Sequence, residues 1–344
     1  MLNNIIELDK LNQFKKLLED YNSFIIIGHI GPDGDAVGSS LGLWHILNAL
    51  GKDAQVLMPN LFPEFLKWMP GSEHIKFYSE TPQEVAKCID QAEVICLLDF
   101  NVLSRVGNEM GTRIEQANAY KVMIDHHLHP GDHCQLTMSY PQAVATSELV
   151  FRLIYQLGLL PKLSKDAAAC LYTGMMTDTG GFTYNSNKKE LYTIISLLLE
   201  TGIDKDLIYR QVNNTYSEDR LRLMGHVLTT MKVYPVNAAL LTLSSKEQSQ
   251  FNFVKGDSEG FVNIPLSIHN VVCSCFLKED EELGLIKVSL RSVGSFPCNQ
   301  MAAEFFNGGG HLNASGGEFY GSMTEAIRRY EEALEKYKSL LLAE

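Results

Sequence analysis

Side chains that could bind metal ions are concentrated in four short segments of this sequence. Each segment contributes carboxylates, alone or together with imidazoles. The residues are His29, Asp33 and Asp35 in the first segment, Asp99 in the second, Asp125, His126 and His127 in the third, and Asp178 in the fourth. Two like charges about 4 Å apart repel by roughly 1 kcal/mol in water and by several times that inside a protein. If the fold brings the segments together, divalent cations must offset this repulsion, and a mixed imidazole and carboxylate set suits manganese, iron or zinc better than magnesium.

The same residues also have ordinary structural interpretations. Asp33 and Asp35 lie among glycines and a proline, in a turn just before a helix that we expect to begin near Ala36, where a carboxylate could simply cap the helix. His126 and His127 could be hydrogen-bonded core residues. Neighbours in an extended segment point in opposite directions, however, so one of these histidines can bind a metal ion while the other meets a substrate. The repetition of acids in all four segments favours the metal site.

Strand and helix patterns alternate in the first half of the chain. Apolar runs typical of buried strands cover 23–29, 53–58, 93–100 and 119–125, and amphipathic helix patterns cover 37–50 and 145–158. This alternation predicts an α/β fold with a mostly parallel sheet flanked by helices. Ligands of such sheets bind beyond the carboxyl ends of the strands, so we expect His29, Asp99 and Asp125 to converge on one crevice.

The rest of the chain indicates a second, smaller domain. Residues 165–178 predict a helix that ends at Asp178, and residues 187–231 are largely helical. The last hundred residues predict a mixed α/β domain with strands, a helix, a glycine cluster at 307–317 and a final helix at 323–342. A length of 344 residues also suits two domains. We predict a first domain at 1–200, a helical linker at 201–235 and a second domain at 236–344.

Composition restricts the partners and the compartment. The formal net charge of -12 argues against a protein that grips long duplex nucleic acid, because that binding requires many cations, but it allows a short anionic substrate held at bound metal ions. The seven cysteines are odd in number and mostly lie in apolar runs, which fits buried thiols in a reducing compartment. The sequence shows neither a secretory signal nor an apolar run near the roughly 20 residues that span a bilayer. We expect a cytoplasmic protein with no membrane partner, and the sequence predicts no particular oligomeric state.

The four segments, taken in order, resemble the motifs of a known family. HIGPDGDAVGS, LLDFN, IDHHLHP and MTDTGGF are similar to the four motifs of the DHH phosphoesterases, and GGGHLNASGG resembles the glycine-rich motif of the DHH-associated C-terminal domain. The resemblance covers nearly the whole chain. One departure is Ser315, at a position where the family often has a second alanine. Within the superfamily, the length and the two domains are most similar to the small oligoribonucleases and 3'-phosphoadenosine 5'-phosphate phosphatases.

The resemblance implies two manganese ions. It assigns His29 and Asp33 to the first ion, Asp35, His126 and Asp178 to the second, and Asp99 to a bridge between them. Asp125 would orient the third motif, and His127 would lie close to the scissile phosphate. Two metal ions about 3.5–4 Å apart can hold a bridging water as hydroxide at neutral pH and offset the charge of the phosphate that it attacks. The implied reaction is metal-driven hydrolysis without a covalent enzyme intermediate.

The resemblance also implies a set of substrate-binding residues. They are Arg105, Arg291, Ser292, Gly308, Gly309, Gly310 and His311. The glycines let backbone amides approach an anion closely, and the histidine can hydrogen-bond a phosphate or a sugar hydroxyl. The alternative for the glycines is a helix entry that needs them for geometry alone. For the two arginines it is a solvated position on the surface.

Together these features predict a metal-dependent phosphodiesterase. We expect it to hydrolyse short RNA oligonucleotides or linear dinucleotides to mononucleotides, and to measure its substrate from a 5'-terminal phosphate bound by His311 and Arg291. An enzymatic alternative is a phosphatase for 3'-phosphoadenosine 5'-phosphate, which needs the same metals and a similar anion pocket. A different class is a non-catalytic sensor of cyclic dinucleotides, but a pure sensor has no need of the complete set of metal ligands.

Overall fold

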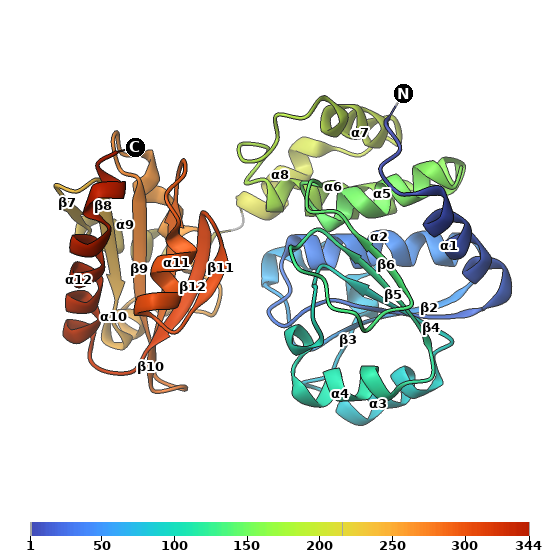
Figure 1. The fold of residues 1–344 in the computed structure, drawn as a ribbon, viewed down its shortest axis with the longest axis horizontal. Helices are drawn as coiled ribbons and strands as arrows, with labels where there is room; N and C mark the ends of the chain where they lie inside the picture. The colour runs from blue at the N-terminus through green and yellow to red at the C-terminus, as the bar shows by residue number, and fades with distance from the viewer. Residues whose placement is uncertain (1, 215, 344) are drawn as a thin grey trace. The chain divides into compact units, whose positions relative to one another are not determined.

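The computed structural model describes residues 2–214 and 216–343 and divides the chain into two compact units (Figure 1). Unit 1 is Met1–Thr215, and unit 2 is Tyr216–Glu344. The predicted boundaries at 200 and 236 fall on either side of this division. Helix α8 (Lys205–Asn213) belongs to unit 1, whereas α9 (Glu218–Thr229) and strand β7 (Lys232–Tyr234) belong to unit 2. The helices that we assigned to a linker are therefore divided between the two units.

Unit 1 is built on a six-stranded sheet whose paired strands are all parallel. The strands are β1 (Ser23–Ile27), β2 (Asp53–Met58), β3 (Lys76–Phe77), β4 (Val94–Leu98), β5 (Tyr120–Asp125) and β6 (Leu136–Ser139), and they lie in the order β3-β2-β1-β4-β5-β6. The predicted α/β fold with a mostly parallel sheet is confirmed. The chain order reverses between β1 and β4, and ligands of such sheets bind at the carboxyl ends of the strands at this point.

Helices cover both faces of this sheet (Figure 1). Successive side chains of a strand point to opposite faces. In β1, Phe24 and Ile26 therefore belong to one core, whereas Ile25 and Ile27 belong to another. The first core is formed with α1 (Leu8–Asp20), α2 (Gly34–Ala49), α5 (Thr146–Gln156), α6 (Lys165–Asp178) and α7 (Lys189–Glu200), and the second with α3 (Pro82–Gln91) and α4 (Asn108–Gln116). Burial on both faces explains why the strands appear in the sequence as continuous apolar runs.

Helices α2 and α6 pack closely because glycines of α2 face α6. Gly34, Gly38 and Gly42 are four residues apart and therefore lie along one face of the helix. A Cβ atom at Gly38 would lie 2.5 Å from the carbonyl oxygen of Cys170, and one at Gly34 would lie 2.2 Å from Oγ1 of Thr177. This close crossing brings the N-terminus of α2 beside the C-terminus of α6. Those two helix ends carry the first and fourth acidic segments.

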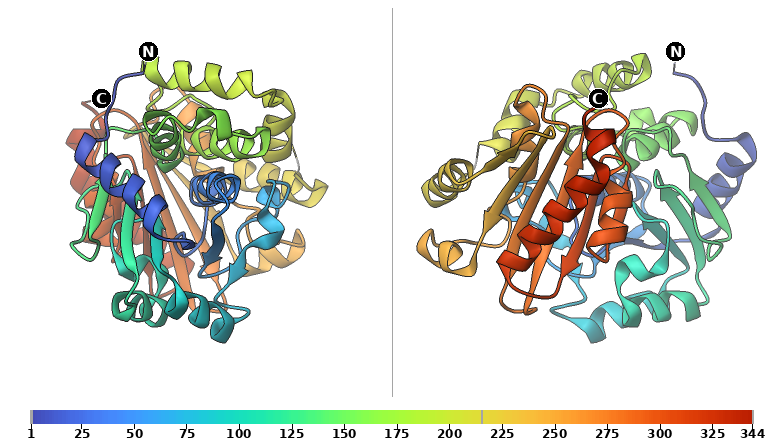
Figure 2. Two further views of the ribbon diagram at one scale, coloured as in Figure 1. Left: turned by 90° about the vertical axis from the view of Figure 1, so that its right-hand side faces the viewer. Right: turned by 60° about the vertical axis from the view of Figure 1, so that its left-hand side comes forward.

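Unit 2 contains a second sheet, of mixed strand direction, in the order β11-β12-β10-β9-β8-β7. Its other strands are β8 (Ala238–Leu243), β9 (Cys273–Asp280), β10 (Leu285–Ser292), β11 (Gly309–His311) and β12 (Ala314–Phe319). Helices α11 (Cys298–Phe305) and α12 (Met323–Leu341) cover one face (Figure 2). On the other face lie α9 and the 3₁₀ segment η5 (Phe261–Ser267), and α10 (Ser245–Gln250) follows β8. Among the residues described here, no helix is both long enough and apolar enough to cross a membrane.

Candidate metal centre

Three adjacent strands of unit 1 deliver the second and third acidic segments and the first histidine. His29 lies two residues after β1, Asp99 directly follows β4, and Asp125 is the last residue of β5, with His126 and His127 next in the chain. Because β1 pairs with β4 and β4 pairs with β5, these residues leave the sheet at the same edge. The structure therefore brings these side chains to the point where the strand order reverses.

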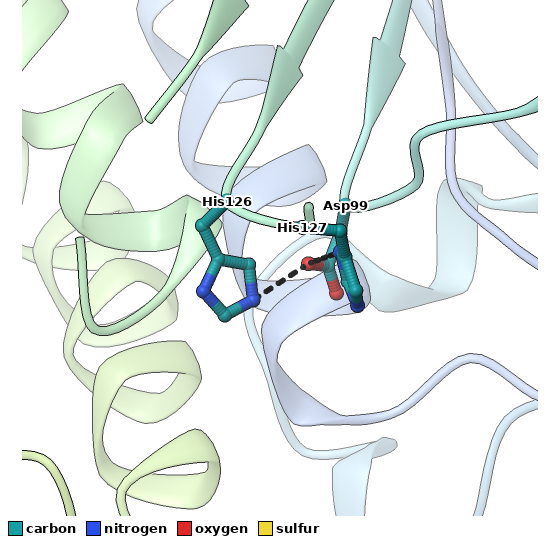
Figure 3. Close-up of side chains that lie close together, drawn as sticks. All are labelled: Asp99, His126 and His127. Carbon is teal, nitrogen blue, oxygen red and sulfur yellow. Dashed lines mark ion pairs between the residues drawn. The ribbon is translucent and has the colours of Figure 1, made fainter. Parts of the chain in front are cut away.

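Asp99 lies at the centre of the cluster, and its two carboxylate oxygens face different partners. Oδ2 lies 3.5 Å from Nε2 of His29. Oδ1 lies 3.5 Å from Nε2 of His126 and 3.9 Å from Nδ1 of His127 (Figure 3). The side chain is 3% exposed. Its backbone is left-handed, with φ of 66°, which is uncommon outside glycine and occurs preferentially at functional sites. The fold thus holds one buried carboxylate between His29 on one side and His126 and His127 on the other.

Potential metal ligands form contiguous groups around Asp99. Within each group the ligand atoms all lie within 4.8 Å of one another. The groups are His29, Asp33 and Asp99; Asp35, His126 and Asp178; and Asp99, His126 and His127. The first two groups share no residue, and the third links them through Asp99 and His126. All the residues of the four acidic segments apart from Asp125 belong to at least one group.

Asp33 combines the two roles considered from the sequence. Its Oδ1 accepts hydrogen bonds from the backbone N–H groups of Asp35 and Ala36, both at 3.0 Å, as the N-cap of α2. Its Oδ2 lies 3.9 Å from Nε2 of His29. The helix begins at Gly34 rather than near Ala36 because of this cap, which places Asp35 in the first helical turn. Capping the helix and facing the cluster are therefore compatible roles for one carboxylate.

Two residues at the start of α5 contact the cluster and were not predicted. The backbone N–H groups of Thr146 and Ser147 donate to Oδ2 and Oδ1 of Asp35, at 2.6 Å and 2.9 Å. The hydroxyl of Thr146 donates to Oδ1 of Asp99 at 3.0 Å. Residues 145–158 were expected only to form an amphipathic helix, although hydroxyl side chains at a helix start are a recognisable signal.

Backbone carbonyls fix the tautomers of two histidines. Nδ1 of His29 is 2.9 Å from the carbonyl oxygen of Ile30, and Nδ1 of His126 is 3.4 Å from that of Ala143. A carbonyl oxygen can only accept, so in the neutral rings the proton is on Nδ1 and the lone pair of Nε2 faces the carboxylates. Metal-binding histidines have this arrangement. His127 differs, because its Nδ1 lies 2.7 Å from Oδ1 of the buried Asp125.

The carboxylates are buried close together, and this changes their protonation. Burial and the nearby carboxylates of Asp35 and Asp33 raise the pKa of Asp99 well above its usual value, and burial also raises the pKa of Asp35. Burial and the Asp35 carboxylate raise the pKa of Asp178 to about 7. Asp178 keeps 31% of its side-chain surface exposed, so water screens part of this effect.

His126 responds in the opposite way to its surroundings. Burial alone would lower its pKa, but the carboxylates of Asp99, Asp178 and Asp35 outweigh that effect and raise the pKa to about 9. In the part of the chain that the structure describes, the ion-pair partners of Asp33, Asp99 and Asp178 are histidines. A buried set of acids with imidazole Nε2 atoms turned toward them fits divalent cations, which would replace the missing positive charge.

Arg105, the substrate-binding candidate in unit 1, lies close to the first segment. It is exposed in the 3₁₀ segment η3 (Leu103–Val106), and its backbone carbonyl accepts a hydrogen bond of 2.7 Å from the N–H of Ile30. The backbone is therefore held next to the residue that follows His29.

Arg291 and Ser292, both in unit 2, end strand β10. Nη1 of Arg291 donates to the carbonyl oxygen of Leu290 at 2.9 Å, and burial lowers the pKa of its guanidinium. No carboxylate forms an ion pair with this arginine among the described residues. The hydroxyl of Ser292 donates to the carbonyl oxygen of Phe296 at 2.8 Å and accepts from Nδ2 of Asn313 at 2.9 Å, so it is used within unit 2.

The glycine cluster forms a strand pair at the edge of the unit 2 sheet. Gly309 and Gly310 belong to β11, which pairs with β12 in antiparallel fashion, so the alternative of a helix entry is wrong. A Cβ atom at Gly308 would lie 1.9 Å from the carbonyl oxygen of Gly316, and Gly310 has φ of 138°. These glycines are therefore needed for the geometry of the hairpin. His311 ends β11 on the exposed side.

Comparison with known proteins agrees with the motifs. Residues 23–175 match the DHH family, N-terminal domain, and residues 237–341 match the DHHA1 domain. The bifunctional oligoribonuclease and PAP phosphatase NrnA of Thermus thermophilus is 31% identical over 310 residues, which are 90% of this chain and 88% of that protein. The chain belongs to the DHH family. The resemblance recognised from the four motifs is confirmed, and DHH membership makes the protein a phosphoesterase.

Two further relatives show the range of the similarity. The cyclic-di-AMP phosphodiesterase GdpP of Bacillus subtilis is 26% identical over 341 residues, which are 94% of this chain but 49% of that protein. The crystal structure of an exopolyphosphatase-related protein from Bacteroides fragilis shares 59% identity, with a TM-score of 0.97 and 99% of both chains covered. The folds of both units are therefore shared with a solved structure over 99% of the chain.

Proposed function

We propose that the protein is a metal-dependent phosphodiesterase that hydrolyses short RNA oligonucleotides and linear dinucleotides to mononucleotides. The main support is the position of Asp99, whose two oxygens face separate histidines at 3.5 Å each. Relatives over most of the chain are named for oligoribonuclease, PAP phosphatase and cyclic-di-AMP phosphodiesterase activities, and these substrates all contain phosphate esters.

The proposed cofactor is a pair of divalent ions, of which manganese is the preferred candidate. We propose His29 and Asp33 as ligands of one ion, Asp35, His126 and Asp178 as ligands of the other, and Asp99 as the bridge. When bound, such ions lower the pKa of a water molecule and offset the negative charge of a phosphate. The buried carboxylates supply the charge that holds them, and the Nδ1 contacts of His29 and His126 keep their Nε2 lone pairs directed at the site.

His127 and Asp125 are proposed to act on the substrate side of the cluster. Asp125 is fully buried, and its Oδ1 accepts a hydrogen bond of 2.7 Å from Nδ1 of His127. This bond fixes the plane of the imidazole ring. We assign His127 to the scissile phosphate and Asp125 to the orientation of His127.

The proposed phosphate-binding residues of unit 2 are Arg291 and the β11 hairpin. The Arg291 guanidinium is largely withdrawn from water, and its hydrogen-bond partners are backbone carbonyls. A bound anion would supply the negative charge that these neutral partners do not. Gly309 and Gly310 are exposed on an edge strand, where backbone amides can approach an anion. We propose Arg105 and His311 as further contacts, and a 5'-terminal phosphate as the group that unit 2 binds.

The proposed compartment is the cytoplasm. All seven cysteines carry free thiols, and five of them are buried. Free thiols in this number are typical of proteins in a reducing compartment.

A phosphatase acting on 3'-phosphoadenosine 5'-phosphate is the second candidate, because the relative from Thermus thermophilus is named for both activities. The non-catalytic sensor remains the alternative from a different class. The intact set of ligand groups around Asp99 supports an enzyme over a sensor.

A substrate panel tests the proposal. It contains RNA and DNA as dinucleotides, pentanucleotides and decanucleotides, each with a 5'-phosphate or a 5'-hydroxyl, together with 3'-phosphoadenosine 5'-phosphate and linear polyphosphate. Every substrate is tested with manganese and with magnesium, using the wild-type protein and the Asp99→Ala variant. We expect the 5'-phosphorylated RNA dinucleotide with manganese to be hydrolysed fastest, and Asp99→Ala to lose turnover while circular dichroism shows an intact fold. Turnover confined to polyphosphate or to the bisphosphate would overturn the assignment to oligonucleotides, and equal rates for 5'-phosphate and 5'-hydroxyl substrates would remove the role of the terminal phosphate.

A further inference from the structure

We propose that Thr146 is a positioning residue that fixes the spacing between the two groups of metal ligands. This inference rests on the proposed function, because it assigns a role toward the ions that function requires. The segment Ala-Thr-Ser-Glu at 145–148 contains none of the proposed metal ligands or substrate-binding residues.

Thr146 contacts both ligand groups at once. Its backbone N–H donates to Oδ2 of Asp35 at 2.6 Å, and its hydroxyl donates to Oδ1 of Asp99 at 3.0 Å. Asp35 belongs to the group with His126 and Asp178. Asp99 belongs to the group with His29 and Asp33, and also to the group with His126 and His127. Thr146 is itself fully buried. A single side chain and its own backbone amide therefore set the position of one carboxylate from each group.

Helix α5 begins without a side-chain cap of its own. Its N-cap residue, Ala145, has no side chain that can accept a hydrogen bond from the first turn. The Asp35 carboxylate, which belongs to α2, takes the place of that cap by accepting from the N–H groups of Thr146 and Ser147. Each oxygen of Asp35 accepts one of these backbone hydrogen bonds. The first turn of α5 is thus capped by a proposed metal ligand on α2 rather than by a neighbouring residue in the sequence.

The start of α5 is held in place from behind. Glu148 accepts from the N–H of Val144 at 2.8 Å and from Nε of Arg152 at 2.7 Å, and Glu148 and Arg152 are both buried. Nη1 of Arg152 donates in turn to the carbonyl oxygen of Asn3 at 3.0 Å. Removing one member of such a buried pair is costly, so this network resists movement.

The packing of α6 leaves no room for an alternative position. A Cβ atom at Gly174 would lie 2.0 Å from Oγ of Ser147 and 2.8 Å from Oδ1 of Asp35. The first turn of α5 and the Asp35 carboxylate therefore fill the space that a side chain on α6 would occupy. The surroundings of Thr146 are fixed, so its hydroxyl holds the Asp99 carboxylate at a set position. Removing the hydroxyl should let that carboxylate move.

Manganese binding to the full-length protein tests this role. Thr146→Val keeps the shape of the side chain and the backbone N–H but removes the hydroxyl, Thr146→Ala removes the hydroxyl without the bulk of valine, and Thr146→Ser retains the hydroxyl. Electron paramagnetic resonance measures both the free manganese during titration and the exchange signal of a coupled pair. We expect the valine and alanine variants to bind manganese about 10- to 100-fold more weakly and to lose coupling, and the serine variant to behave as wild type.

The matched control is Thr173→Val in α6. Thr173 is also fully buried, and its hydroxyl donates to the carbonyl oxygen of Ala169 at 2.7 Å, away from the ligand carboxylates. This variant removes a buried threonine hydroxyl and should leave manganese binding unchanged.

Three results would overturn the positioning role. These are wild-type manganese affinity and coupling in both Thr146→Val and Thr146→Ala, an equal loss in Thr146→Ser, or an equal loss in Thr173→Val. In each case the wild-type protein still binds manganese, so the proposed function stands. If the wild-type protein bound no manganese pair, both proposals would fail.

Discussion

At the scale of single residues, the site is a group of acids that the fold holds closer together than their charges favour. Burial and mutual repulsion raise the pKa values of Asp35, Asp99 and Asp178, and the same acids raise the pKa of His126. Without a cation, protons are the available source of positive charge for these groups. Metal ions and protons therefore compete for the same side chains.

The metal-free protein should lose stability as the pH rises. The folded-state pKa of Asp178, about 7, lies above the value of about 3.9 expected in the unfolded chain. Its protonated form therefore stabilises the fold at low pH, and this contribution is lost as the pH rises through about 7. The pKa of His126, about 9 in the folded state, acts in the same direction through about pH 9. In a chelator, we expect the melting temperature to fall between about pH 5 and about pH 9.

Added manganese and one variant serve as the controls for this pH dependence. Manganese should raise the melting temperature more at high pH than at low pH, because binding releases protons. In the chelator, the melting temperature of Asp178→Asn should no longer fall as the pH rises through about 7. A melting temperature in chelator that rises steadily over this range would show that the cluster is not strained by its own charge.

At the scale of the elements, the site depends on how closely α2 approaches α6. Gly34, Gly38 and Gly42 form the contact face of α2, and the crossing places Asp35 and Asp178 in one ligand group. The glycines therefore support the proposed metal site through helix packing, by letting α2 approach α6.

Gly38→Ala should separate the two helices and weaken the site. The added methyl group would lie 2.5 Å from the carbonyl oxygen of Cys170, and overpacking of this kind typically costs about 1–3 kcal/mol. We expect the free energy of unfolding to fall by that amount and manganese affinity to fall with it, measured by denaturant titration and by metal titration.

Gly225→Ala is the matched control for this substitution. Gly225 lies in α9, where an added Cβ would meet no atom within 4 Å. The change should stabilise the protein by up to about 1 kcal/mol and leave metal binding unchanged. The packing account fails if both alanine substitutions affect manganese binding alike.

The sequence carried enough information to predict most of these elements, and the reasons for the exceptions are physical. Helix α6 has the predicted bounds, 165–178, because its start has a serine cap and its end meets a glycine turn. The contacts of Thr146 and Ser147 with Asp35 and Asp99 were not predicted. A local sequence pattern can indicate a helix start but not which distant carboxylate binds to it. The β11 hairpin was not predicted because consecutive glycines carry no strand periodicity, and its pairing depends on the neighbouring strand β12.

At the scale of the whole molecule, the two units carry different parts of the proposed activity. The ligand groups all belong to unit 1, whereas Arg291 and the β11 hairpin belong to unit 2. Metal binding and phosphate binding should therefore be separable by mutation.

Arg291→Ala should weaken substrate binding without affecting the metals. We expect the KM for a 5'-phosphorylated dinucleotide to rise about tenfold or more, because a partly buried cation is lost from the anion site. Manganese affinity should equal that of the wild type. The comparison variant is Lys287→Ala, on the same strand but half-exposed and paired with Asp280, which should change neither quantity. An unchanged KM in Arg291→Ala would remove this residue from the site.

The number of divalent ions bound per chain, measured together with turnover, tests the central claim most directly. Purified protein is stripped with a chelator and titrated with manganese by calorimetry, while hydrolysis of a 5'-phosphorylated RNA dinucleotide is followed at each addition. The account predicts two ions per wild-type chain, no turnover in the stripped protein, recovery as the second ion binds, and loss of both binding and turnover in Asp99→Ala. Full hydrolysis by the stripped protein, or unchanged metal binding in Asp99→Ala, would contradict it.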